Sequence, residues 1–165
     1  MRLRQGGPAD LSAVLETFDA TVAWLVEHGR SAQWGERPWS QDPRRVARVK
    51  ELVAEGLWVA EVGDGTAGFL TVTERAPGYA PRVRERELYV HLLLVSRAYS
   101  GRDVGGKLLS FARRRARERG VGLVRVDCWA GGDGALVRYY EGQGFTPVAR
   151  VPVGGTEVQM FEYRV

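Results

Sequence analysis

The feature that most constrains this chain is an apolar run followed by a glycine-rich turn and a basic segment. Residues 87–95 are ELYVHLLLV, and residues 99–109 are YSGRDVGGKLL. Three glycines, Gly101, Gly105 and Gly106, fall within six residues, whereas a simple turn needs only one. The pattern predicts a buried strand that leads through a glycine loop into a helix, as in an α/β fold.

The glycine segment has two interpretations. The first amides of a helix have no internal hydrogen-bond partner and lie at the positive end of the helix dipole, so they bind anions. Glycine lets a ligand reach that backbone without meeting a Cβ atom. In the alternative interpretation, the glycines only allow a tight, well-packed turn. The spacing matches neither a P-loop nor a dinucleotide-binding fingerprint, so these two nucleotide sites are excluded.

The periodicity and the turn signals predict one mixed α/β domain over residues 1–165. The apolar run 87–95 is the most hydrophobic strand candidate and is expected at the centre of a sheet. A GDG sequence predicts a hairpin, and Asp42 followed by Pro43 predicts the start of a helix. The expected strands are 2–5, 57–62, 66–73, 87–95, 121–128, 146–152 and 156–164, and the expected helices are 8–29, 43–55, 104–119 and 134–142.

The composition is typical of a folded protein, with 44% hydrophobic and 27% charged residues. No apolar run approaches the roughly 20 residues that span a bilayer, and the N-terminus lacks the apolar core of a signal peptide. We therefore expect a cytoplasmic protein without membrane association. One cysteine, Cys128, excludes an internal disulfide and a cysteine-based zinc site. Two histidines, His28 and His91, argue against a multi-histidine metal site, so we expect no metal.

Five arginines lie between residues 113 and 119, and the chain has a net charge of +4. This run has three interpretations: a nucleic-acid contact, a site for an anionic cofactor, or a solvated helix face. Because the arginines point all round a helix, the solvated face is favoured. No docking motif for DNA accompanies them, so we do not expect nucleic acid as a partner.

A second motif follows at residues 127–145, DCWAGGDGALVRYYEGQGF: a strand end, a glycine loop, a short helix with two tyrosines, and a Gly-Phe pair. Together with residues 87–109 it resembles the GNAT superfamily of acyl-CoA-dependent N-acetyltransferases. The resemblance is close over about residues 87–146 and extends to the order of elements elsewhere. It implies the GNAT fold, a mixed, mostly antiparallel sheet of about seven strands, splayed between the fourth and fifth and flanked by about four helices.

The resemblance also implies how acetyl-CoA is held as a co-substrate. In this family a Q/R-x-x-G-x-G/A signature opens the third helix and binds the cofactor pyrophosphate. The fourth strand presents backbone amides to the pantetheine arm and the thioester oxygen. The implied cofactor-binding residues are Leu93, Leu94, Val95, Ser100, Gly101, Arg102, Asp103, Val104, Gly105, Gly106 and Lys107.

Two positions depart from that signature. Ser100 stands where glutamine or arginine is usual, and Asp103 stands where the first glycine is usual. Aspartate can adopt left-handed backbone angles and cap the helix, but its carboxylate would lie near the phosphates. We expect this to lower the affinity for the cofactor unless Arg102 and Lys107 offset the charge.

Acetyl transfer from a thioester to an amine needs a neutral amine and a proton for the leaving thiolate. Tyr140 falls on the family's tyrosine position and is the implied acid, whereas its neighbour Tyr139 is expected in the core. As the base, His91 competes with Glu87 and with a chain of water molecules. The structural alternatives are a hydrogen-bonded core aromatic for Tyr140 and a packed residue for His91. For Cys128 a buried thiol is the favoured interpretation.

The loop of residues 30–41 contains Trp34 and Trp39, in the region where the family shapes its acceptor pocket. They are interpreted either as core or lid residues, or as aromatic walls for a partly apolar or cationic amine. The predicted function is N-acetyl transfer from acetyl-CoA to a small-molecule amine by direct attack in a ternary complex. The alternative is a GNAT-fold module that binds acyl-CoA or a partner without turnover. A homodimer is left open.

Overall fold

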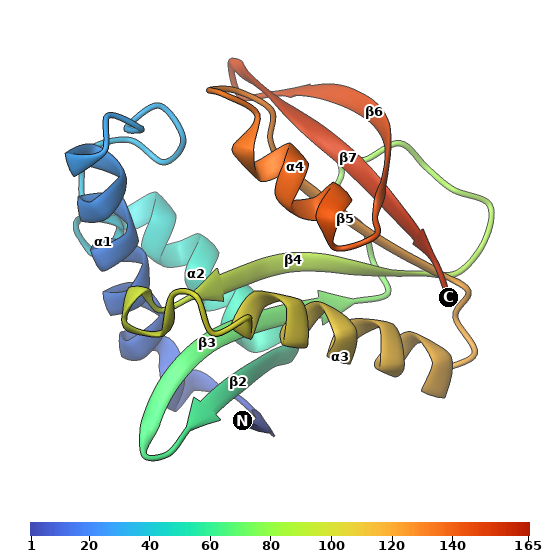
Figure 1. Cartoon of the computed structure of the whole chain (residues 1–165), viewed down its shortest axis with the longest axis horizontal. Helices are drawn as coiled ribbons and strands as arrows, with labels where there is room; N and C mark the ends of the chain where they lie inside the picture. The colour runs from blue at the N-terminus through green and yellow to red at the C-terminus, as the bar shows by residue number, and fades with distance from the viewer. The chain divides into compact units, whose positions relative to one another are not determined.

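The apolar run at the middle of the chain forms a central strand, β4 (Glu87–Val95), of a seven-stranded sheet. The computed structural model describes all residues, 1–165, and the strand order is β1-β2-β3-β4-β5-β7-β6 (Figure 1). β4 and β5 run parallel, whereas the pairs β1–β2, β2–β3, β5–β7 and β6–β7 are antiparallel. These pairings confirm the predicted mixed, mostly antiparallel sheet with the apolar run at its centre.

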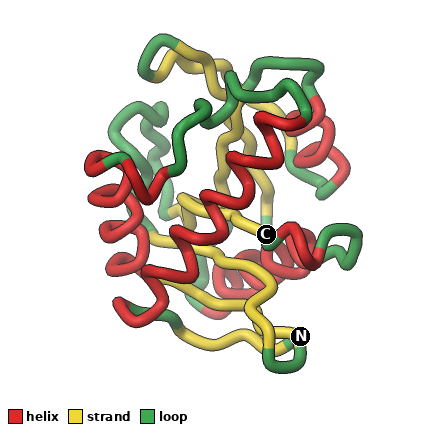
Figure 2. Tube along the Cα trace, turned by 90° about the vertical axis from the view of Figure 1, so that its left-hand side faces the viewer, coloured by secondary structure: helices red, strands yellow, loops and turns green.

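Four α-helices connect the strands, as predicted, and Figure 2 traces the helices in red and the strands in yellow. None of these helices has the length and apolar character needed to cross a membrane. The other elements are three short 3-10 helices, Pro8–Asp10, Trp39–Gln41 and Arg97–Tyr99. The α-helices are α1 (Leu11–Glu27), α2 (Pro43–Gly56), α3 (Val104–Glu118) and α4 (Ala135–Gly142).

The chain divides into two compact units, and the first consists of residues 1–72 and 92–108. It contains β1 (Arg2–Gln5), α1, α2, β2 (Leu57–Val62), most of β3 (Gly65–Thr73), the end of β4 and the start of α3. Its core is a cluster of buried apolar side chains from both helices and the sheet. The cluster members are Val14, Phe18, Val49, Leu52, Val53, Leu57, Val59, Phe69, Leu92 and Leu94.

Local signals set the helix boundaries in this unit. The Asp42 carboxylate accepts a hydrogen bond from the Arg44 amide at 3.0 Å, and Pro43 occupies the first turn, so α2 starts where the sequence predicts. α1 begins at Leu11 rather than at Pro8, because residues 8–10 form a 3-10 turn. Gly29 follows α1 with a positive φ of 68°, in line with its predicted role as the helix stop.

The second unit consists of residues 73–91 and 109–165. It contains the start of β4, the rest of α3, β5 (Leu123–Trp129), α4, β6 (Thr146–Val153) and β7 (Thr156–Arg164). β5 pairs with β7 from Leu123 to Trp129, but with β4 only as far as the pair Val90–Val126. β6 and β7 form the predicted hairpin, and Gly154 and Gly155 turn it with positive φ angles.

Candidate functional site

The glycine segment joins β4 to α3 through two left-handed residues. After the 3-10 turn Arg97–Tyr99, Gly101 has a φ of 79° and Asp103 a φ of 54°, and α3 begins at Val104. The amide of Lys107 donates to the Asp103 carbonyl at 3.1 Å, closing the first turn of the helix. The amides of the three residues before Lys107 are those that a helix leaves without an intrahelical partner. The loop therefore presents a row of backbone donors at the positive end of α3.

The Asp103 carboxylate lies over this first turn. A Cβ atom built on Gly106 would come within 2.2 Å of Asp103 Oδ1, so only glycine is accommodated at residue 106 with this carboxylate in place. Asp103 is exposed, as are Ser100, Gly101, Arg102 and Lys107, whereas Val104, Gly105 and Gly106 are buried. An internal anion thus lies at the helix N-terminus, where its charge is favourable.

Two cations border the same turn. The Lys107 ammonium group donates to the Arg102 carbonyl at 3.3 Å, and the Arg102 guanidinium lies 5.3 Å from the centre of the Tyr99 ring. Neither cation forms an ion pair with Asp103, so both charges remain available to an exposed anion.

The strand that leads into the loop is held closely against its neighbour. A Cβ atom on Gly68 would come within 2.8 Å of the Leu94 carbonyl and 3.2 Å of Val104, so glycine at residue 68 lets β3, β4 and α3 approach one another. Leu94 is buried, with 2% of its surface exposed, whereas Leu93 and Val95 are partly exposed. The predicted cofactor residues 93–95 and 100–107 all belong to the first unit.

The two tryptophans of the 30–41 loop pack against α1. The Trp39 ring stacks on Phe18 with centroids 4.0 Å apart and an interplanar angle of 9°, and Trp34 lies 5.2 Å from the same ring. The Arg45 guanidinium covers Trp39 at 4.2 Å. Both tryptophans remain only partly buried at the margin of the core cluster. Their packing fits the core or lid interpretation, and their role toward an acceptor stays a prediction.

Of the two tyrosines of α4, Tyr140 is the buried one and Tyr139 is exposed. Tyr140 is buried, with 7% exposed, while Tyr139 is 37% exposed, so the prediction that Tyr139 is the core residue is wrong. The Tyr140 ring packs 5.4 Å from Phe161 and 6.1 Å from Phe145, because this face of the short helix is turned toward the sheet. Tyr140 forms no hydrogen bond in the structure, so its hydroxyl is not satisfied by the core. Burial, together with Cys128 nearby, raises the pKa of this phenol above its ordinary value.

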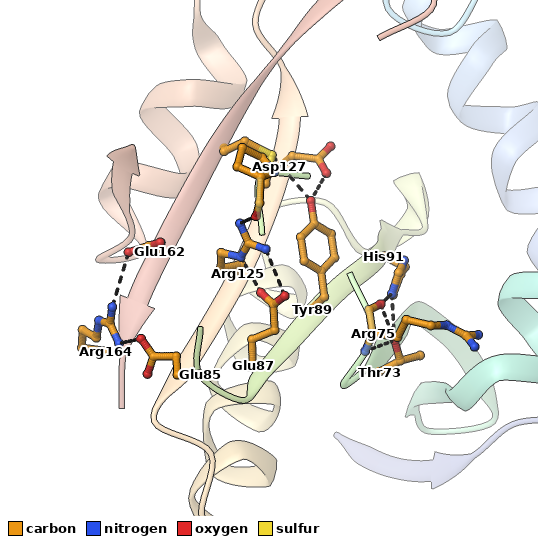
Figure 3. A network of polar contacts seen from close by, with 12 residues as sticks. Thr73, Arg75, Glu85, Glu87, Tyr89, His91, Arg125, Asp127, Glu162 and Arg164 are labelled. Atoms are coloured by element: carbon orange, nitrogen blue, oxygen red, sulfur yellow. Dashed lines mark hydrogen bonds and ion pairs between the residues drawn. The ribbon is translucent and has the colours of Figure 1, made fainter. Parts of the chain in front are cut away.

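His91 has a defined hydrogen-bonding arrangement. Its Nε2 atom lies 2.9 Å from both the Arg75 carbonyl and Thr73 Oγ1 (Figure 3). The Thr73 hydroxyl itself donates to that carbonyl at 2.9 Å. A carbonyl oxygen only accepts, so the arrangement favours the tautomer with its hydrogen on Nε2, and the basic lone pair is then on Nδ1.

Glu87 is part of a buried ion pair. Its carboxylate accepts hydrogen bonds from Nε and Nη2 of Arg125, the latter at 3.0 Å, and the side chains are 10% and 2% exposed. The Arg125 guanidinium also donates to the Pro81 carbonyl at 2.8 Å. Hydrogen bonding to Glu87 raises the pKa of Arg125 above its ordinary value. Protonating Glu87 would leave this cation unpaired in the protein interior.

A cluster that the sequence reasoning missed surrounds Asp127 on β5. Both the Tyr79 hydroxyl, at 2.8 Å, and the Tyr89 hydroxyl donate to Asp127 Oδ2. Figure 3 shows the Tyr89 side chain reaching from β4 to Asp127, beside the Glu87–Arg125 pair. Tyr89 is 1% exposed, and burial with the neighbouring Asp127 charge raises its pKa. The available signal was a pair of oppositely charged residues, Arg125 and Asp127, two positions apart within an otherwise apolar strand.

One arginine of the run in α3, Arg113, is partly buried and contacts α4 and β7. Arg113 donates to the Gln143 carbonyl at the end of α4, and its guanidinium lies 4.0 Å from the Tyr163 ring. The Nε atom of Arg113 is buried without a partner, and burial lowers the pKa of this guanidinium.

Cys128 is a buried free thiol, which is the interpretation that the sequence favours, and burial raises the pKa of this thiol to about 12. No group of side chains suited to hold a metal ion is present.

The candidate residues thus fall into two groups, one in each unit. The glycine segment, the end of β4, Trp34 and Trp39 belong to the first unit, and Glu87, His91 and Tyr140 belong to the second. Within the second unit, Tyr89 connects the other polar residues, since its ring lies 5.1 Å from the His91 ring and its hydroxyl contacts Asp127.

Comparison with solved structures shows the same fold in proteins described as acetyltransferases. An acetyltransferase of the GNAT family from Listeria monocytogenes superposes with a TM-score of 0.74 at 21% identity, covering 99% of this chain and 94% of that one. The yncA structure from Salmonella typhimurium, solved with its cofactor acetyl-CoA, has a TM-score of 0.63 at 20% identity, with coverages of 99% and 92%. An aminoglycoside 6'-N-acetyltransferase in complex with coenzyme A has a TM-score of 0.65 at 13% identity, with coverages of 99% and 97%.

A comparison with curated proteins finds no match to the sequence. The sequence model of the acetyltransferase (GNAT) family, in contrast, matches residues 23–145, most of the chain. That span includes the strand, the glycine segment and the tyrosine helix described above. By this match, and with the GNAT fold observed, the chain belongs to the GNAT acetyltransferase family.

Proposed function

We propose that residues 1–165 act as one catalytic domain, which transfers the acetyl group of acetyl-CoA to an amine of a small-molecule acceptor. The observation that carries this proposal is the β4–glycine loop–α3 segment, with its left-handed Gly101 and Asp103 and its amide-bearing first helical turn. Membership of the acetyltransferase family and the coenzyme A complexes of similar folds support acetyl-CoA as the donor.

The residues of the glycine segment fit a pyrophosphate if the Asp103 side chain moves aside. The amides of Val104, Gly105 and Gly106 and the exposed cations Arg102 and Lys107 supply donors and positive charge at one helix end. The Asp103 carboxylate lies over the same turn, so it must rotate away when phosphate oxygens approach. Because Asp103 is exposed, this rotation needs no repacking of the core. The backbone of residues 93–95 would hold the pantetheine arm.

The chemistry needs a neutral amine and a proton donor for the thiolate that leaves when the amide bond forms. Nδ1 of His91 is the assigned base, because hydrogen bonding at Nε2 favours the tautomer with the lone pair on Nδ1. Glu87 is assigned a positioning role rather than the base role, since its carboxylate already pairs with Arg125. Tyr140 is the assigned acid, because its hydroxyl makes no hydrogen bond and a phenol is protonated at neutral pH, the more so with the raised pKa of this group.

The other candidate function is a binding module that holds acyl-CoA without turnover. Its support is specific: Ser100 lacks the long donor usual in the family signature, and Asp103 brings a negative charge to the phosphate position. Two independent measurements separate the two functions, namely binding of acetyl-CoA and release of the CoA thiol.

The test is a thermal shift with acetyl-CoA followed by a thiol-release assay across a panel of primary amines. We expect acetyl-CoA to raise the melting temperature and at least one amine to release CoA. Lys107→Ala should raise the Michaelis constant for acetyl-CoA several-fold, whereas Lys50→Ala, an exposed lysine of α2, should not. Stabilisation without thiol release would favour the binding module, and no stabilisation at all would contradict both functions.

A further inference from the structure

The carboxylate of Asp127 has an environment that suits an organic cation. We propose that Asp127 binds a second, non-reacting ammonium group of the acceptor, so that short diamines are preferred over monoamines. This inference rests on the amine-acetylating function proposed above and names the acceptor class for it.

The Asp127 carboxylate is held in a fixed orientation with one oxygen unused. Tyr79 and Tyr89 both donate their phenol hydrogens to Oδ2, the former at 2.8 Å. No hydrogen bond or ion pair reaches Oδ1 in the structure. Two donors on one oxygen leave the other oxygen as the acceptor for a ligand, and the rigid Tyr89, 1% exposed, prevents the carboxylate from turning away.

The charges around Asp127 also favour a cationic ligand. Arg125, two residues earlier on β5, is already neutralised by Glu87 in the buried ion pair, so it supplies no net charge to Asp127. Asp127 is partly buried and has no ion pair of its own, although the chain carries a net charge of +4. A partly buried carboxylate without a counter-charge is costly, and a cationic ligand would supply that charge. The Tyr79 ring beside it, 41% exposed, adds an aromatic face for an ammonium group.

Asp127 also lies close to the assigned base, His91. Pairing of β4 with β5 stops at Val90–Val126, so His91 and Asp127 are the first residues of their strands beyond the last pair. Tyr89 lies between their side chains, with its ring 5.1 Å from that of His91 and its hydroxyl on Asp127. The assigned base and the carboxylate are thus one tyrosine side chain apart, a separation that a short aliphatic chain spans.

The assignment of the non-reacting ammonium to Asp127 follows from acid–base chemistry. A carboxylate that pairs with an ammonium group raises the pKa of that group and keeps it protonated. Such a partner would hinder attack by the reacting amine, which must be neutral. Asp127 therefore suits the cation that stays charged, and His91 suits the amine that loses its proton.

The test compares straight-chain α,ω-diamines, from the propane to the hexane compound, with alkylamines and ω-amino acids of equal length. Wild type should acetylate the best diamine with a kcat/KM at least about 10-fold above its alkylamine. Asp127→Asn should lower the diamine value by about 10- to 100-fold and leave the alkylamine value within about 2-fold. Asp64→Asn, in the exposed β2–β3 turn, should match wild type. A diamine preference that persists in Asp127→Asn overturns the proposal, as does equal use of the ω-amino acids.

A binding measurement separates this inference from the proposed function. Calorimetric titration of CoA-saturated protein with the diamines should show saturable binding that Asp127→Asn weakens at least about 10-fold. If no amine releases thiol but diamine binding depends on Asp127, the catalytic function fails and the cation site stands. If alkylamines bind or react as well as diamines, the site fails and the catalytic function stands. Should Asp127→Asn not fold, Tyr79→Phe must weaken diamine binding about 3-fold or more, and an unchanged affinity overturns the proposal.

Discussion

Glu87 on β4 and Arg125 on β5 form a buried ion pair with two hydrogen bonds, and their side chains are only 10% and 2% exposed. Glu87→Gln should destabilise the protein by about 3 kcal/mol, because it leaves the Arg125 cation unpaired in the interior. The double variant Glu87→Leu, Arg125→Met should recover most of that loss. Urea unfolding of the single and double variants measures both effects.

The same variants test the assignment of the base. If Glu87 only positions Arg125, folded Glu87→Gln should retain the shape of the wild-type pH–rate profile, whereas His91→Gln should lose the acidic limb. Loss of that limb in Glu87→Gln, at a temperature where the variant is folded, would make Glu87 the base instead of His91.

Removing the charge of Asp103 should lower the stability of the protein but strengthen the binding of acetyl-CoA. Asp103→Asn keeps a residue that tolerates a φ of 54° but removes the negative charge over the first turn of α3. Thermal stability should fall by about 0.5 kcal/mol, because an anion at a helix N-terminus is stabilising. The Michaelis constant for acetyl-CoA should fall about 3- to 10-fold, because the phosphates no longer compete with a carboxylate. An unchanged or higher Michaelis constant contradicts the proposed position of the pyrophosphate.

The strands, helices and family were predictable because local signals agreed with the fold. The Asp42-Pro43 helix start, the GDG hairpin and the glycine segment each set a boundary that the structure confirms. The burial of Tyr140 rather than Tyr139 was not predictable, since two adjacent aromatics give no sign of which one a short helix turns inward. The Asp127 cluster depends on contacts with Tyr79 and Tyr89, which are distant in sequence. The contacts of Arg113 were not predictable either, because nothing in the sequence distinguishes it from the other arginines of the same run.

The thiol of Cys128 should be unreactive. Burial raises its pKa to about 12, and only 8% of the residue is exposed. At pH 8 about one molecule in ten thousand would then carry a thiolate, the reactive form. Folded protein should therefore resist iodoacetamide at pH 8 and react rapidly in denaturant, as measured by mass spectrometry. Cys128→Ala should retain turnover, and rapid labelling of the folded state would contradict the buried assignment.

The Arg4–Asp10 ion pair should make stability dependent on acid pH. Hydrogen bonds from the Arg4 guanidinium, at 2.7 Å for the shorter one, hold the pKa of Asp10 below its ordinary value. A lowered folded-state pKa means that the contribution is complete above the unfolded pKa of about 3.9 and is lost as the pH falls through the folded value. Asp10→Asn should cost about 1 kcal/mol at pH 7, and this cost should become progressively smaller as the pH falls below about 3.9. A pH-independent cost in urea unfolding, with Asp64→Asn as the control, would contradict this origin.

The most direct test of the catalytic account is the rate of CoA release by Tyr140→Phe, with an amine that the wild type acetylates. The change keeps the ring packed against Phe161 and removes only the hydroxyl. Turnover should fall by about 10²- to 10⁴-fold while acetyl-CoA binding stays near wild type. Tyr139→Phe, at an exposed position, should leave turnover almost unchanged. Because the pKa of Tyr140 is raised, wild-type turnover should show no alkaline limb from this group below about pH 10. Full activity in Tyr140→Phe, or equal losses in both variants, would contradict the assignment of Tyr140 as the acid.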